Sequence, residues 1–146
     1  MSKFLFLLLF SFSLFAKAPF NVEDEYFIKG YDPVSYIKSS KAVKGKKEFR
    51  LNYEGVEILF SSLDNKNVFE AQPSKYLPEY NGYCAYAMAD SGDLVEVDPK
   101  SFKVINGKTY LFYDGFFADT LKLWNNKQDD QGQITSADKN WQKHKK

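Results

Sequence analysis

Two segments in which apolar and polar residues alternate constrain the fold of this chain most strongly. In residues 48–60, apolar side chains occupy every second position up to a Glu54-Gly55 turn and again on the return. Residues 102–113 hold a second pair of apolar runs around Asn106-Gly107, the dipeptide preferred in two-residue type I′ turns. A period of two is typical of β-strands. Each segment therefore predicts an antiparallel β-hairpin, and apolar groups on both faces of the last strand predict that it is covered on both sides.

Helical signals lie after each hairpin. Ser61 is a candidate N-cap for a helix that must end before Pro73. Apolar residues recur at helical spacing over residues 117–124, and a last short helix is expected to start at Thr135 with Trp141 as its anchor. No internal repeat or linker indicates a second domain. The predicted class is α+β: a small single domain of two antiparallel β-hairpins packed with short helices.

The first eighteen residues have the pattern of a secretory signal peptide. Lys3 supplies the positive start, residues 4–15 form an apolar run, and Ala16-Lys17-Ala18 matches a small-x-small cleavage site. The alternative is a membrane anchor, but a helix over this run spans only ~18 Å of the ~30 Å hydrocarbon core. We therefore expect cleavage after Ala18 and no stable membrane anchor afterwards.

Export sets the expected organisation and location of the mature chain. Residues 19–28 form an acidic lead-in that we expect to be loosely held, residues 29–142 form the domain, and residues 143–146 form a basic tail expected to fray. The protein is expected in the periplasm if its source is a Gram-negative bacterium, and otherwise as a secreted protein.

Composition excludes several classes of function. The chain has one Cys and one His, which excludes an intrachain disulfide framework and zinc sites built on clusters of those residues. Loss of residues 1–18 removes Lys3 and Lys17 from 20 basic residues and leaves 19 acidic ones, so the formal net charge changes from +1 to −1. A nearly neutral chain lacks the basic surface typical of nucleic-acid binding, so we expect no nucleic-acid partner.

Several motifs occur together in a fixed order along the mature chain. They are Gly30-Tyr31-Asp32-Pro33-Val34, Phe60-Ser61-Ser62, Phe69-x-x-x-Pro73-x-x-Tyr76, Tyr80-x-Gly82-Tyr83-Cys84-Ala85, Asp98-Pro99 with Phe102, Asn106-Gly107-Lys108-x-Tyr110-Leu111 and Asp138-x-Asn140-Trp141. This order resembles the YHS domain, in particular the exported bacterial YHS-domain proteins, which usually consist of one domain behind a signal peptide. The resemblance covers residues 29–141.

The resemblance implies handling of a soft metal such as copper, but the ligands of the metal-binding relatives are replaced. Those relatives carry Cys after the Asp-Pro-Val, after the last aromatic residue of the hairpin, and four residues later. Here the three positions hold Ser35, Ser61 and Asn65. A hydroxyl or an amide is a poor substitute for a thiolate toward a soft metal. The family's metal site therefore does not carry over residue by residue.

Cys84 is the one remaining reactive side chain, and three interpretations of it stay open. Free Cys is often a buried small hydrophobe. Alternatively, Cys84 and Met88 stand four residues apart, so on a helical turn their sulfurs share a face and together suit Cu(I), with Tyr83 and Tyr86 lining the same pocket. A redox or intermolecular role is the third interpretation. No basic residue lies close to Cys84 in the sequence to lower the pKa of its thiol, so a role as a nucleophile is not favoured.

Asp32 and the tyrosines have a structural and a binding interpretation each. Asp32 is a good helix cap, and it would be a ligand-binding carboxylate if it faced Cys84 or Tyr83. Tyr31 is expected either to pack in the core or to line a concave site together with the other phenols. His144 lies in the lysine-rich tail, where we expect it to be solvated. Residues 127–138 have a weak likeness to a calcium loop, but Lys127 occupies the first ligand position, so a polar loop is favoured.

The function predicted from these features is that of an exported, non-catalytic YHS-type binding domain. Its target would be a small ligand or a soft metal, with copper as the candidate ion; Cys84 and Met88 are the candidate metal ligands. The candidate ligand-binding residues are Tyr31, Asp32, Tyr83 and Tyr86. The alternative is a structural module that binds a protein of the cell envelope. An enzyme is the least favoured class, because the only His lies in the tail and no catalytic motif is present.

Overall fold

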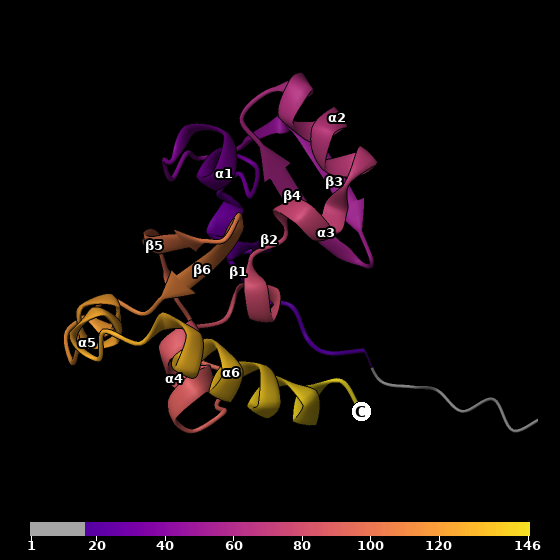
Figure 1. The fold of residues 1–146 in the computed structure, drawn as a ribbon. Helices are drawn as coiled ribbons and strands as arrows, with labels where there is room; N and C mark the ends of the chain where they lie inside the picture. The colour runs from indigo at the N-terminus through magenta and orange to yellow at the C-terminus, as the bar shows by residue number, and fades with distance from the viewer. Residues whose placement is uncertain (1–16) are drawn as a thin grey trace, which may run out of the picture.

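Three two-stranded antiparallel sheets and six α-helices make up the α+β fold of residues 17–146, which are the residues described by the computed structural model (Figure 1). The sheets pair β1 (Val22–Glu23) with β2 (Tyr26–Phe27), β3 (Lys46–Tyr53) with β4 (Val56–Phe60), and β5 (Asp98–Ile105) with β6 (Lys108–Phe112). The fold class and both predicted hairpins are confirmed. The candidate signal peptide lies outside the described residues except for its last two positions.

The turns of the two larger hairpins explain why the sequence predicted them. Tyr53 pairs with Val56 and Ile105 pairs with Lys108, so each turn has two central residues. Glu54-Gly55 and Asn106-Gly107 all have positive φ, as type I′ turns require. The glycines adopt this backbone at no steric cost, and a Cβ at either would meet no atom within 4 Å. Local chemistry is therefore sufficient to specify both turns.

The prediction that the acidic lead-in is loosely held is wrong. Instead, the lead-in forms the β1–β2 hairpin, in which Val22 pairs with Phe27 and Glu23 with Tyr26. Its turn residues Asp24 and Glu25 have φ of 52° and 73° without being glycine. Strands of two residues show no alternation, and a non-glycine turn carries no strong signal. This hairpin therefore could not be recognised in the sequence.

The three helices predicted after the hairpins are present with shifted starts. The helices are α1 (Ser35–Ser39), α2 (Leu63–Ala71), α3 (Pro73–Tyr76), α4 (Ala85–Asp90), α5 (Thr120–Asn126) and α6 (Asp130–Trp141), with 3₁₀ turns at Ile28–Gly30, Glu79–Gly82 and Gln142–His144. The three predicted ones are α2, α5 and α6, whereas α3 and α4 were not predicted. The cap of α2 is Ser62, whose hydroxyl accepts a bond from the Asn65 N–H, rather than the predicted Ser61. Because α6 begins at Asp130 and not at Thr135, most of the calcium-like segment is helix, and Asp129 serves as its cap.

The tail is more ordered than the sequence analysis expected. His144 is half-buried, its Nε2 lies 2.8 Å from the carbonyl oxygen of Gly92, and its ring packs on Trp141. The indole of Trp141 is 7% exposed and anchors the end of α6. The prediction of a solvated His144 is therefore wrong, because a contact distant in the sequence holds it in place.

Two hydrophobic clusters share β6 as a common wall. The N-terminal core contains Phe27, Tyr36, Phe60, Phe69, Cys84 and Leu111, and the C-terminal core contains Tyr80, Met88, Phe112, Trp124 and Trp141. Leu111 faces the first cluster, and its strand neighbours Tyr110 and Phe112 face the second. Figure 1 shows β3–β4 with α2 and α3 at one end, α4 and α6 at the other, and β5–β6 between them. The predicted burial of this strand on both faces is confirmed.

No helix within residues 17–146 has the length and apolar character needed to cross a bilayer.

Buried phenols predict a loss of stability in alkali. Burial raises the pKa of Tyr110 to about 12, and it also raises the pKa values of Tyr36 and Tyr80. Unfolded tyrosines ionise near pH 10, whereas these folded phenols stay protonated. Their contribution is therefore complete below about pH 10 and falls as pH rises above this value, and the part from Tyr110 is lost by about pH 12.

We expect the midpoint of urea unfolding, followed by circular dichroism, to fall across this interval. The variant Tyr80→Phe should show a shallower fall, because it removes one buried phenol. Equal slopes in the wild type and in Tyr80→Phe would contradict the assignment of the alkaline instability to this group.

Candidate functional site

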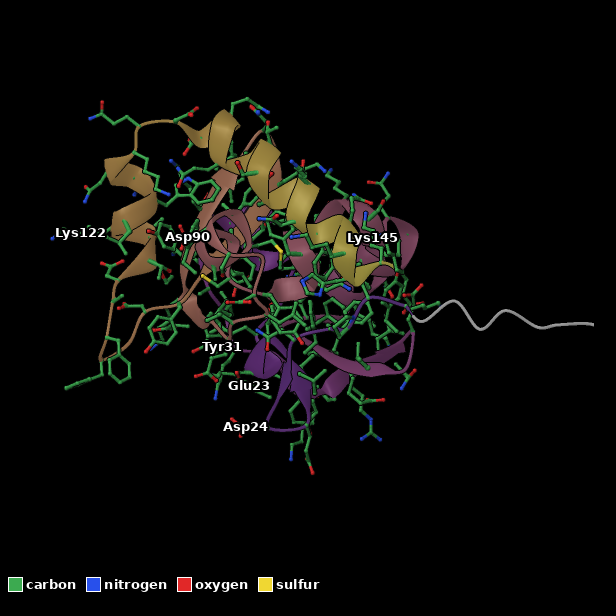
Figure 2. All side chains as sticks on the ribbon, turned by 90° about the horizontal axis from the view of Figure 1, so that it is seen from below. Glu23, Asp24, Tyr31, Asp90, Lys122 and Lys145 are labelled. Carbon is green, nitrogen blue, oxygen red and sulfur yellow. The ribbon has the colours of Figure 1, made fainter. Side chains whose placement is uncertain are left out.

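A recess of about 380 Å³ lies where the β1–β2 hairpin, the segment before α1 and the start of β5 meet. Its charged lining consists of the lysines Lys29, Lys44 and Lys100 and the carboxylates Asp24, Glu96, Asp98 and Asp114. The phenols of Tyr31 and Tyr113 contribute the aromatic part. Figure 2 shows Glu23, Asp24 and Tyr31 on the same side of the molecule. We call this recess the Tyr31 pocket.

Tyr31 is held in the wall of the pocket by its backbone and its ring. The residue forms an antiparallel bridge with Lys44, and the Lys44 ammonium nitrogen lies 5.9 Å from the centre of the Tyr31 ring. A cation over the face of an aromatic ring is attracted by the ring quadrupole. The predicted site residue Tyr31 thus lines a concave site, beside a lysine that the sequence analysis did not select.

Glu23 does not line the Tyr31 pocket, but it contacts two residues that do, Lys29 and Glu96. The ammonium of Lys29 lies 3.0 Å from a carboxylate oxygen of Glu23. Burial, followed by the neighbouring Glu96 carboxyl, raises the pKa of Glu23, and the bond to Glu23 raises the pKa of Lys29. A raised carboxyl pKa means that Glu23 binds a proton more readily than an exposed glutamate does.

Asp32 follows Tyr31 in the chain but does not line the pocket, and its carboxylate is fully buried. One oxygen accepts a bond of 2.8 Å from the Val34 N–H. The other oxygen accepts the Ser61 N–H at 2.8 Å, the Ser61 hydroxyl at 2.6 Å and the Asn65 side-chain amide at 2.7 Å. The Ser35 hydroxyl donates to the Asp32 carbonyl oxygen. We call this arrangement the Asp32 clamp, because it ties the chain before α1 to the start of α2.

The Asp32 clamp brings together the three positions that the resemblance to the YHS domain equates with Cys ligands. Ser35, Ser61 and Asn65 lie around one aspartate, although Ser61 and Asn65 are 29 and 33 residues from it in the sequence. Their polar groups donate to Asp32, so the carboxylate is already satisfied by hydrogen bonds within the chain. Asp32 is not the predicted helix cap, because the N-cap of α1 is Val34. Its carboxylate instead stabilises the turn before α1 through the Val34 N–H and links this turn to the start of α2.

Cys84 and Met88 both pack in the hydrophobic interior of the domain. Both side chains are fully buried, and they belong to different hydrophobic cores. The Cys84 sulfur accepts a bond of 3.3 Å from the Tyr113 N–H and lies 3.4 Å from the Thr120 hydroxyl. Within residues 17–146, no group of three or more His, Cys, Asp or Glu side chains is placed to hold a metal ion. The geometry favours the interpretation of Cys84 as a packed core residue.

Burial of Cys84 predicts slow reaction of its thiol. We expect N-ethylmaleimide to modify Cys84 only at the rate at which the protein opens, and to do so rapidly in denaturant, because the sulfur has no exposed surface in the folded state. Mass spectrometry of timed samples measures both rates. Complete modification of the native protein at the rate of the denatured chain would show that the sulfur is accessible.

The other two candidate tyrosines lie apart from the Tyr31 pocket. The Tyr83 hydroxyl donates to the Phe20 carbonyl oxygen at 3.1 Å, and burial raises the pKa of this phenol. Tyr86 lies under the ammonium of Lys127, at 4.8 Å from its ring centre. Neither residue is part of the pocket lining. The six candidate residues therefore divide among the pocket, the clamp and the two cores.

Tyr113 and Lys44 were missed in the sequence because no local signal marks them. Tyr113 contributes its ring to the pocket and its N–H to the Cys84 sulfur. It follows β6, whereas Tyr31 precedes α1, so only the packing of two distant segments places the two phenols in one wall.

Comparisons of the chain with known protein families, with characterised proteins and with solved structures found no match. Membership of the YHS family thus stays a prediction based on the sequence motifs.

Proposed function

We propose that the mature chain is an exported, non-catalytic YHS-type domain that binds a small polar ligand in the Tyr31 pocket. The observation that carries the proposal is the pocket itself. Its volume of about 380 Å³ lies in the range of small-molecule sites, which is roughly 300–1,000 Å³. The pattern of residues 1–18 supports export, and the order of the motifs supports the family assignment.

The lining of the pocket favours a ligand that carries both charges. Carboxylates of Asp24, Glu96 and Asp98 suit an ammonium group, while the lysines suit a carboxylate or another anion. A small zwitterion such as a free amino acid meets both requirements. The soft-metal form of the hypothesis receives no support from Cys84 and Met88, so the ligand that we propose is organic.

An NMR titration of the ¹⁵N-labelled mature protein tests this proposal. The probes are glycine, alanine and glutamate as zwitterions, with acetate and methylammonium as controls that carry one charge. We expect a zwitterion to shift the NMR resonances of the backbone amides of Tyr31, Lys44 and Asp98. These shifts should become smaller as salt is added. The single-charge controls should produce smaller shifts at the same concentration. No shift at the pocket with any zwitterion would contradict the proposed ligand class.

Two lysine variants provide a matched comparison. Lys44 and Lys75 each lie over a tyrosine ring, but only Lys44 lines the pocket. We expect Lys44→Ala to weaken zwitterion binding by about two- to fivefold, the size of an exposed charge contact. Lys75→Ala should leave binding unchanged. Equal effects of the two variants would show that binding does not take place in the Tyr31 pocket.

A further inference from the structure

The connection from β6 to α5 exposes two neighbouring phenylalanines almost completely. Phe116 is 96% and Phe117 is 88% exposed, whereas the next most exposed large apolar side chain of the described residues, Leu63, is 56% exposed. Their rings contact one another edge to face at 5.3 Å between centres. Apolar side chains that lie together on a surface mark interaction sites more often than single ones do.

Hydrogen bonds at its base give this aromatic turn a defined shape. The Gly115 N–H donates to the Ala118 carbonyl oxygen at 3.1 Å, and Asp114 forms an antiparallel bridge with Asp119. Below them, the Thr120 N–H and hydroxyl both donate to the Tyr113 carbonyl oxygen, at 3.0 and 2.7 Å. A Cβ at position 115 would meet the Tyr113 phenol, so the absence of a side chain at Gly115 lets this ring pack closely against the turn. The two rings are therefore presented on a closed neck at the edge of the fold, next to α5 (Figure 1).

A second copy of this chain is a poor occupant for the aromatic turn. The Tyr31 pocket is lined mainly by charged residues, and another recess of the described chain is lined by Lys127, Asp129, Gln133 and other small or polar residues. Neither recess offers an apolar cleft for two rings. Direct pairing of two such turns would also bury far less than the ~800 Å² per partner of a standard interface. It would further place the carboxylates of Asp114 and Asp119 close to those of the other copy.

The carboxylates of Asp114 and Asp119 also argue against a membrane surface as the binding partner of the aromatic turn. Asp114 and Asp119 are both exposed and flank the two rings at the neck. Insertion of the rings would move these carboxylates toward the lipid headgroups, and surface-binding segments that insert aromatic residues carry Lys and Arg instead. An anionic leaflet would repel the neck. The charges suit a protein surface on which basic groups surround an apolar cleft.

From these features we infer that Phe116 and Phe117 insert into an apolar cleft of a different protein, whose rim carries Lys or Arg side chains that face Asp114 and Asp119. The exposed rings supply the apolar contact, and the paired carboxylates select a basic rim by charge complementarity. This docking surface is distinct from the Tyr31 pocket, although Asp114 belongs to both.

Site-specific photocrosslinking in the cells that produce the protein tests this inference. The photoreactive residue p-benzoylphenylalanine replaces Phe117 in the full chain, and a control chain carries it at the exposed position of Leu63. We expect an adduct from position 117 that is absent from position 63. Mass spectrometry should place the crosslink in an apolar cleft of the partner that is flanked by Lys or Arg.

Binding of the identified partner, produced in purified form, gives the quantitative test. We expect Phe116→Ser/Phe117→Ser to weaken binding at least thirtyfold without changing the circular dichroism spectrum or the melting temperature, because both rings are outside the core. Asp114→Asn/Asp119→Ser should weaken binding about fivefold and reduce its salt dependence. The hydroxyl introduced at position 119 by this variant can still cap α5, so the helix is expected to stay intact.

Three results would overturn the inference. The first is equal crosslinking from positions 117 and 63. The second is an adduct with another copy of this chain. The third is sedimentation with phosphatidylcholine or phosphatidylglycerol vesicles that depends on Phe116 and Phe117, which would identify a membrane as the occupant.

Discussion

Replacement of Asp32 by alanine is expected to lower the free energy of unfolding by about 3–5 kcal/mol, because it leaves several donors without an acceptor. The Val34 and Ser61 N–H groups both donate to this buried carboxylate, as do the side chains of Ser61 and Asn65. Each buried donor that loses its partner costs about 1–3 kcal/mol. Water can reach the half-buried side chains in part, so the backbone donors dominate the expected loss.

Urea unfolding at neutral pH measures this effect, and two further variants separate its causes. Asp32→Asn preserves the side-chain volume but replaces one accepting oxygen by an NH₂ group, which is itself a donor and cannot accept the existing hydrogen bonds. It should therefore remain strongly destabilising. Asp64→Ala removes a carboxylate that is exposed and paired with Lys38, and it should change the stability little. Similar small effects of Asp32→Ala and Asp64→Ala would show that the Asp32 clamp does not hold α1 and α2 together.

Replacement of Trp124 by alanine is expected to cost about 3–5 kcal/mol, because it empties the centre of the C-terminal core. Trp124 is fully buried, and its ring packs against Phe112 and Tyr110 at centre distances of 5.4 and 6.3 Å. Its indole N–H donates to the Asp130 carboxylate at 2.6 Å. The alanine variant therefore loses packing and a charge-assisted hydrogen bond between α5 and the start of α6.

The contributions of packing and hydrogen bonding can be measured separately. Trp124→Phe keeps most of the apolar volume and removes the N–H, so it should cost less than Trp124→Ala. Leu123→Ala is the control on the same helix, since Leu123 is 39% exposed and should contribute less than about 1 kcal/mol. Calorimetric unfolding of the three variants gives the comparison. A cost for Trp124→Ala no larger than that for Leu123→Ala would refute the assigned role of the indole.

Elements with a local signal could be predicted from the sequence. The hairpins of β3–β4 and β5–β6 follow from alternation and from turn residues that accept positive φ. The end of α2 before Pro73 follows from steric exclusion at the residue before proline. The start of α6 was misplaced because Asp129, its actual cap, lies in a polar segment without apolar periodicity.

The candidate site was predictable only in part. Tyr31 and Asp32 were selected from one motif, and the structure gives these neighbours different surroundings: one lines the pocket and the other forms the clamp. Cys84 and Met88 were paired from their helical spacing, but β6 separates the cores to which they belong. Helical spacing describes the direction of a side chain and not the layer into which it packs.

The sequence by itself determined the β3–β4 and β5–β6 strand pairs, their turns and the α+β class, because these depend on residues that are close together along the chain. Tertiary structure alone decided the Tyr31 pocket, the burial of Cys84 and the exposure of Phe116 and Phe117. Asp32 meets Ser61 and Asn65 across separations of 29 and 33 residues. Such contacts depend on how whole elements pack, and no local pattern of residue types specifies which distant side chains will share a wall.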